Sequence, residues 1–233
     1  WLSAVWILIA NSWMQTPRGF EMAQKNGQPV VSLVDPMAAY LNPRFPWMFV
    51  HMQSAAVLSV ALFMCGVAAY HLRGGLRKRD DGEEPDRGEL DDARFWQTTM
   101  KLGLAVLLVT APFQVVHGDS YARHVAETQP QKFAAMEAQY ETEAPAALHL
   151  VAIPTDPEAF TNPRAENLWT VDIPALTSVL ASGGNPNYEV TGLSEFEESP
   201  PVAIVFWSFR LMVLLGFWFV ALGLWGAWRW RQG

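Results

Sequence analysis

Three side chains in apolar segments of the chain are suited to chemistry. His51 lies in FVHMQSAAVL, close to the start of a long apolar run, and Arg210 and Met212 lie two positions apart in SFRLMVLLGFWF. A charged side chain within a membrane-spanning helix normally faces the interior of a helical bundle, where it finds a partner. On physical grounds alone, Arg210 is therefore the residue for which we expect a functional role.

His51 and Met212 belong to two different apolar segments and together suggest iron ligation. An imidazole and a thioether form the axial ligand pair of a six-coordinate, low-spin haem iron that passes electrons. A nearby arginine could neutralise haem propionates or favour the reduced haem. Each ligand also has an ordinary alternative, because a single histidine near the end of a span often packs at the interface, and a buried methionine commonly fills a core. The residues alone leave both interpretations open.

Polar segments of the chain offer two further candidates. In QPQKFAAMEAQYE, Lys132 could hold an oxygen of a quinol while Glu137 accepts its proton. The alternative is a solvated helix face with ordinary charges. His117, Asp119 and His124 are also ligand-capable, but their spacing matches no standard metal site.

Composition indicates that membrane-spanning helices must position these residues. Of the 233 residues, 51% are hydrophobic, yet the mean hydropathy is only +0.08 because long apolar runs alternate with polar, acidic stretches. This alternation is typical of a polytopic membrane protein with sizeable loops. The single cysteine, Cys65, excludes an internal disulfide framework and a cysteine-based metal site.

The apolar runs predict an all-α, polytopic transmembrane helical bundle with three full spans, one partial span and a long periplasmic loop. A full span needs about 20 apolar residues in a helix. Residues 47–72, 94–116 and 203–228 meet this requirement. Residues 1–13 form the partial span, which is apolar from its first residue, so we expect the chain to be a fragment of a longer protein.

Basic residues predict the orientation of the spans. Segment 73–93 and the tail 229–233 carry Arg and Lys next to span ends, which places both in the cytoplasm. Loops 14–46 and 117–202 then face the periplasm. The longer loop has many more acidic than basic residues, which argues against nucleic acid as a partner. Its first half predicts one or two short helices, and its second half, rich in Pro, Asn and Gly, predicts irregular structure.

Several motifs, in this order, resemble subunit I of the cytochrome bd quinol oxidases, bacterial respiratory enzymes that reduce dioxygen with electrons from quinol. WILIANSWMQTPRGFE is similar to a helix end and its following turn in that family. FVHMQSAA resembles the helix that bears the low-spin haem histidine, and FRLMVLLGF the helix that bears the methionine ligand. GDS and QKFAAMEAQYET resemble the start of the outward, periplasmic quinol-binding loop. The resemblance covers nearly the whole chain.

The resemblance assigns a role to each candidate. It implies His51 and Met212 as axial ligands of the low-spin haem b, with Arg210 stabilising the reduced form of that haem. It implies Lys132 and Glu137 as the catalytic residues of quinol oxidation.

It also implies partners and a location. The substrate would be ubiquinol or menaquinol, and the protein partners would be subunit II and small accessory subunits. The location would be the bacterial cytoplasmic (inner) membrane and its lipids. The N-terminal histidine helix and the C-terminal GRQPW-type motif of the family do not occur in this sequence. We therefore expect the high-spin haem b and haem d only in the full-length protein, and no oxygen reduction by this chain alone.

Two other classes remain open at this point. In a haem-free membrane transporter or scaffold with an arginine-lined site, Arg210 would bind an anion or pair with a carboxylate. A dihaem membrane cytochrome b would need paired histidines on facing helices, and His71 has no obvious partner at the inner side. A redox-active Soret and α band distinguishes the cytochromes from the haem-free class.

Overall fold

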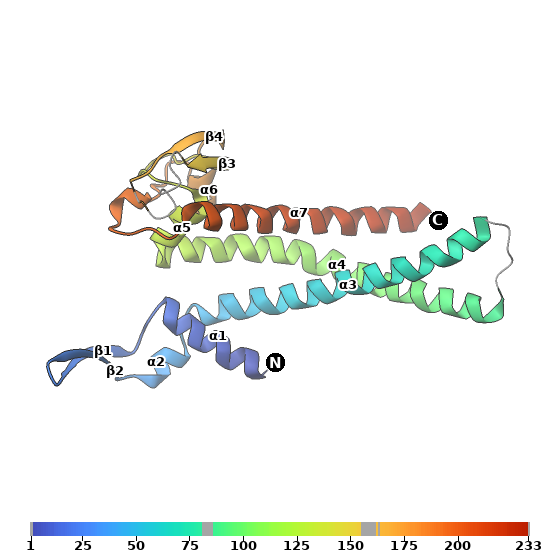
Figure 1. Cartoon of the computed structure of the whole chain (residues 1–233), viewed down its shortest axis with the longest axis horizontal. Helices are drawn as coiled ribbons and strands as arrows, with labels where there is room; N and C mark the ends of the chain where they lie inside the picture. Colours follow the sequence, from blue (N-terminus) through green and yellow to red (C-terminus); the bar gives the residue numbers. More distant parts are fainter. Residues whose placement is uncertain (1, 81–85, 155–161, 163, 233) are drawn as a thin grey trace. The chain divides into compact units, whose positions relative to one another are not determined.

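The structure is a computed structural model that describes residues 2–80, 86–154, 162 and 164–232 (Figure 1). The chain divides into two compact units. The first comprises Trp1–Met52 and Gly118–Arg210, and the second comprises Gln53–His117 and Leu211–Gly233. The three long helices of the chain contribute to both units.

These long helices are α3 (Phe45–Asp80), α4 (Arg87–Thr128) and α7 (Val202–Gln232). In length and apolar composition, all three are able to cross a membrane. The chain is mostly helical, so the expected fold class is confirmed. Helix α4 continues well past residue 116, the end of its predicted span, because SYARHVAET contains no residue that stops a helix.

The second unit is a packed set of segments from α3, α4 and α7. Its core residues are Leu58, Leu107 and Ala111, with Leu62, Leu104, Phe219 and Val220 packed against them. Glycines allow close approach between these helices. A Cβ added to Gly103 of α4 would lie 2.6 Å from the sulfur of Cys65 in α3. Small residues at helix contacts are typical of packing in membranes.

In the first unit, a hairpin follows helix α1 (Leu2–Gln15). Strands β1 (Phe20–Lys25) and β2 (Gln28–Leu33) pair in antiparallel fashion. The two residues between them, Asn26 and Gly27, have φ values of 54° and 77°. Asn-Gly with positive φ at both positions is the preferred two-residue hairpin turn. The short helix α2 (Pro36–Tyr40) then leads into α3.

The long loop folds around the start of α7 (Figure 1). It contains α5 (Pro130–Glu137), the antiparallel strands β3 (Leu148–Pro154) and β4 (Asn167–Ile173), α6 (Leu176–Ser182) and the short 3-10 helix η2 (Leu193–Glu195). Helix α5 lies where a short helix was predicted. The prediction of irregular structure in the second half was wrong, because LHLVAIP and NLWTVDI are rich in apolar and β-branched residues that favour strands.

Candidate functional site

Arg210 ends in a buried ion pair with Glu137. Its Nη2 donates to Glu137 Oε2 at 2.6 Å, and its Nε donates to the carbonyl of His149 at 2.7 Å. Arg210 is only 7% exposed and Glu137 only 4%. Charge-assisted hydrogen bonds of this kind are about twice as strong as neutral ones. Two residues singled out separately in the sequence are therefore in direct contact.

Helix α5 brings Glu137 to this contact. The helix starts with Pro130 in its first turn, and its C-cap is Ala138, which has a left-handed conformation with φ of 52°. Ala134 and Ala135 are fully buried in the same core as Phe206 of α7. Because alanine side chains are small, α5 approaches α7 closely, and a carboxylate in its last turn reaches Arg210.

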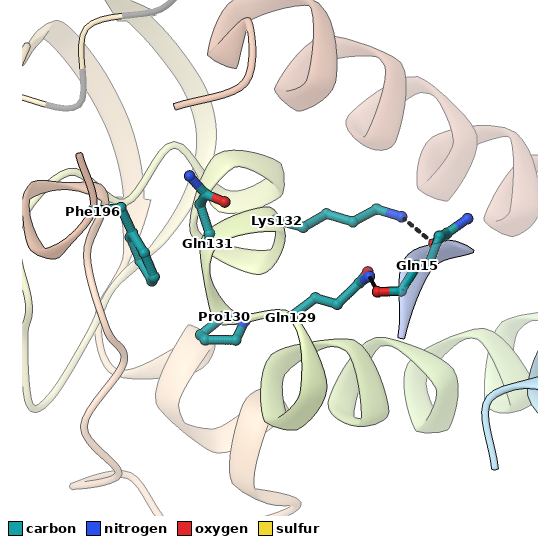
Figure 2. Close-up of a pocket in the computed structure, with 6 residues that line it drawn as sticks. All are labelled: Gln15, Gln129, Pro130, Gln131, Lys132 and Phe196. Atoms are coloured by element: carbon teal, nitrogen blue, oxygen red, sulfur yellow. Dashed lines mark hydrogen bonds between the residues drawn. The ribbon is translucent and has the colours of Figure 1, made fainter. Parts of the chain in front are cut away.

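Lys132 lies at a pocket of about 460 Å³, lined by Gln15, Gln129, Pro130, Gln131, Lys132 and Phe196 (Figure 2). Figure 2 shows Lys132 and Gln129 both directed toward Gln15. Lys132 Nζ donates to Gln15 Oε1 at 3.3 Å, and Gln129 Nε2 donates to the carbonyl of Gln15 at 2.7 Å. Desolvation by the surrounding protein, and then the charge of Arg44, lower the pKa of Lys132.

Glu137 does not line this pocket. It lies five positions after Lys132 on α5, and five steps of 100° leave the two residues about 140° apart around the helix axis. The structure therefore directs Lys132 to the pocket and Glu137 to Arg210.

His51 faces the start of the long loop. A Cβ added to Gly118 would lie 3.3 Å from Cε1 of the imidazole, so the glycine in GDS leaves room for the ring. The ring of Tyr121 lies 5.8 Å from the imidazole, centroid to centroid.

Met212 belongs to the second unit. It is 51% exposed, whereas Arg210, two residues earlier, is 7% exposed. Two helical steps place residues about 200° apart, so the thioether and the guanidinium lie on different faces of α7. The thioether of Met212 is exposed and the imidazole of His51 is half-buried. As residue types, a thioether and an imidazole are the axial ligand pair of a low-spin haem iron.

Other ligand-capable residues have different surroundings. No group of three or more His, Cys, Asp or Glu able to hold a metal ion occurs in the described part of the chain. Asp119 forms an ion pair with Arg123, and the ring of His124 stacks on Trp47 at 5.8 Å. His117, Asp119 and His124 belong to no such group within the described residues.

Sequence reasoning missed Arg44, which lies immediately before α3 in NPRFP. It is 1% exposed, and its Nη2 donates to the hydroxyl of Tyr121 at 3.1 Å. The available signal was an arginine between two prolines at the start of a predicted span.

Together these features define a helical protein with membrane-length helices, in which an acidic residue of the long loop is paired with an arginine of a long apolar helix. Residues 1–232 match the family model of cytochrome bd terminal oxidase subunit I. The chain belongs to this family.

Individual relatives agree with the family match. The chain is 30% identical to cytochrome bd ubiquinol oxidase subunit 1 of Bacillus subtilis, over 97% of this chain and 46% of the relative. It is 32% identical to cytochrome bd-II ubiquinol oxidase subunit 1 of Escherichia coli, over 78% of this chain and 31% of the relative. The solved bd oxidase of Geobacillus thermodenitrificans superposes with a TM-score of 0.74 at 28% identity, covering 95% of this chain and 45% of that one. The chain thus spans less than half the length of these relatives.

Proposed function

We propose that this chain forms the quinol-oxidising, haem-ligating part of subunit I of a bd-type oxidase. The observation that carries the proposal is the contact between Glu137 and Arg210 at 2.6 Å. It joins α5, whose Lys132 lines a pocket, to α7, which carries Met212 two residues beyond the arginine.

Lys132 and Glu137 have separate tasks in this proposal. The pocket at Lys132 falls within the size range of small-molecule sites. The ammonium group holds a quinol oxygen there, and Gln15 and Gln129 orient the ring. Quinol oxidation releases two protons and two electrons. The two protons pass one after the other to Glu137 when its contact with Arg210 loosens, and both leave on the outer side.

His51 and Met212 would hold the low-spin haem b, which supplies one-electron acceptor chemistry when bound. Gly118 leaves room for the imidazole in this position, because a Cβ there would lie 3.3 Å from its Cε1. Arg210 contributes a buried positive charge two residues from Met212, and such a charge favours the reduced form of a nearby redox group.

The remaining functions belong to the full-length protein. We propose that it oxidises ubiquinol or menaquinol and reduces dioxygen at the high-spin haem b and haem d, in the bacterial inner membrane, with subunit II and small accessory subunits. Release of protons outside and uptake from the cytoplasm would generate a proton-motive force.

Replacement of His51 tests the haem assignment. In the full-length protein, His51→Ala is expected to abolish the low-spin haem signal in the reduced-minus-oxidised spectrum. The control is His71→Ala, since His71 stacks on Trp96 at 4.0 Å and is no proposed ligand; it should keep the signal. An unchanged spectrum in His51→Ala contradicts the assignment.

The family match counts against the haem-free transporter or scaffold, although Arg210 does pair with a carboxylate, as that class would require. Absence of a redox-active Soret band from the intact full-length protein would favour it.

A further inference from the structure

Arg44 is a buried cation whose hydrogen-bonding capacity is largely unused. It is 1% exposed, and only its Nη2 has a side-chain partner, the hydroxyl of Tyr121. Its Nε and Nη1 have no hydrogen-bond partner within the described residues. Leaving donors of a buried guanidinium unsatisfied is costly, so buried charges are normally paired. This side chain therefore indicates a missing anionic partner.

The surroundings of Arg44 contain further positive charge. Desolvation, and then the charge of Arg44, lower the pKa of Lys132, so the two cations repel each other. In the described part of the chain, no carboxylate forms an ion pair with Arg44. An anion positioned between these cations would satisfy the guanidinium and relieve the repulsion.

Arg44 lies close to the face of α3 that carries His51. Arg44 immediately precedes α3, and its carbonyl accepts from the amide of Met48 at 3.1 Å, so it joins the first turn. Seven helical steps bring a residue back to within about 20° of the same face, about 10 Å further along the axis. Tyr121 connects the two positions, because its ring lies 5.8 Å from the imidazole and 5.4 Å from Cζ of Arg44.

Two other anion sources fit less well. Arg44 does not line the pocket at Lys132, so an oxygen of a quinol bound there would meet Lys132 and Gln15 first. The 1% exposure of Arg44 keeps it from lipid headgroups at the surface. A carboxylate of a group bound at His51 would lie outside the pocket at Lys132 and would be buried together with Arg44.

We propose that Arg44 binds a propionate of the haem that His51 ligates, as its counter-ion and hydrogen-bond donor. This inference rests on the proposed function of His51. It assigns the haem orientation as well, with propionates toward the outer end of α3.

The test compares two haems in the full-length protein, produced without haem and then loaded. One is protohaem, and the other is its dimethyl ester, in which both propionates are uncharged. Wild-type protein should bind the ester at the low-spin site roughly 10- to 100-fold more weakly, because one charge-assisted interaction is lost. Equal affinity for the two haems would overturn the inference without any change to the protein.

Variants of Arg44, tested with both haems, complete a double-mutant cycle between the arginine and the propionates. Arg44→Gln should bind protohaem as weakly as the wild type binds the ester, with no further loss on the ester, and Arg44→Lys should recover part of the affinity. Arg164→Gln, the same substitution at an exposed arginine of the same unit, should behave as the wild type. If Arg44→Gln lowers the affinity for both haems equally, the role of Arg44 is structural and the inference is overturned.

A further outcome separates this inference from the proposed function. If Arg44→Gln changes only the KM for quinol and leaves the haem midpoint potential unchanged, the anion is the substrate and the inference is wrong. Failure of the proposed function would instead appear as a retained low-spin haem signal in His51→Ala.

Discussion

At the residue scale, the ion pair between Glu137 and Arg210 is buried on both sides, so each charge depends on the other. We predict that Glu137→Ala and Arg210→Ala each lower the free energy of unfolding by about 3–5 kcal/mol. Each substitution leaves the charge of the other residue buried without its partner. The double variant should cost much less than the sum of the two. Unfolding of the detergent-solubilised protein measures all three values.

The exposed pair between Arg94 and Asp91 provides the matched control. Its atoms are 3.3 Å apart, but the side chains are 78% and 65% exposed. Surface pairs contribute about 0–1 kcal/mol, so Arg94→Ala should leave the unfolding transition nearly unchanged. Additive costs at Glu137 and Arg210 would mean that the two residues act independently.

Lys132 gives a prediction about pH. Its pKa is lowered by desolvation and by Arg44, so the charged ammonium destabilises the folded state. That cost is fully present below the lowered pKa and disappears above the ordinary lysine value of about 10.4. Because Lys132 is exposed and solvent screens its charge, Lys132→Gln should raise the melting temperature only slightly at pH 7, by an amount that shrinks as the pH approaches 10.

The same substitution should raise the KM for quinol, because it removes the group proposed to hold the substrate. Stability gained at the expense of activity is common at functional sites. A melting temperature that falls at pH 7 would contradict the assigned effect of the charge.

At the scale of elements, glycine contacts set how closely α3 and α4 pack in the second unit. A Cβ at Gly103 would lie 2.6 Å from Cys65 Sγ and 3.2 Å from the carbonyl of Ala61. We predict that Gly103→Ala destabilises the protein by about 1–3 kcal/mol through overpacking. Gly66→Ala is the control, since nothing lies within 4 Å of a Cβ there. It should be neutral or stabilising by up to about 1 kcal/mol, as thermal unfolding would show.

The elements also show what the sequence could predict. The apolar runs of the sequence predict the three long helices, because this pattern is local and does not depend on tertiary contacts. Pairing of Glu137 with Arg210 spans 73 positions and depends on how Ala134 and Ala135 pack, which no local pattern encodes. The Asn26-Gly27 turn was a local signal that sequence reasoning overlooked. Arg44 was missed because its burial, unlike its charge, is a property of the folded chain.

At the scale of the whole molecule, charge should decide how the helices cross the membrane. Arg and Lys cluster in residues 73–79 and again in the tail, whereas loop 117–202 is acidic. Basic residues next to span ends remain in the cytoplasm. We therefore predict that the long loop, with Lys132 and Glu137, faces outward, the side on which the proposed quinol oxidation would release its protons.

Cysteine labelling in intact cells can test this orientation. In a Cys65→Ala background, Asn187→Cys lies at an exposed position of the long loop, and Gln232→Cys at an exposed position of the tail. A membrane-impermeant maleimide should label the first in intact cells and the second only after permeabilisation. The opposite pattern would place the acidic loop in the cytoplasm. Protons from a quinol bound at Lys132 would then be released inside, and quinol oxidation at this site could not contribute to a proton-motive force.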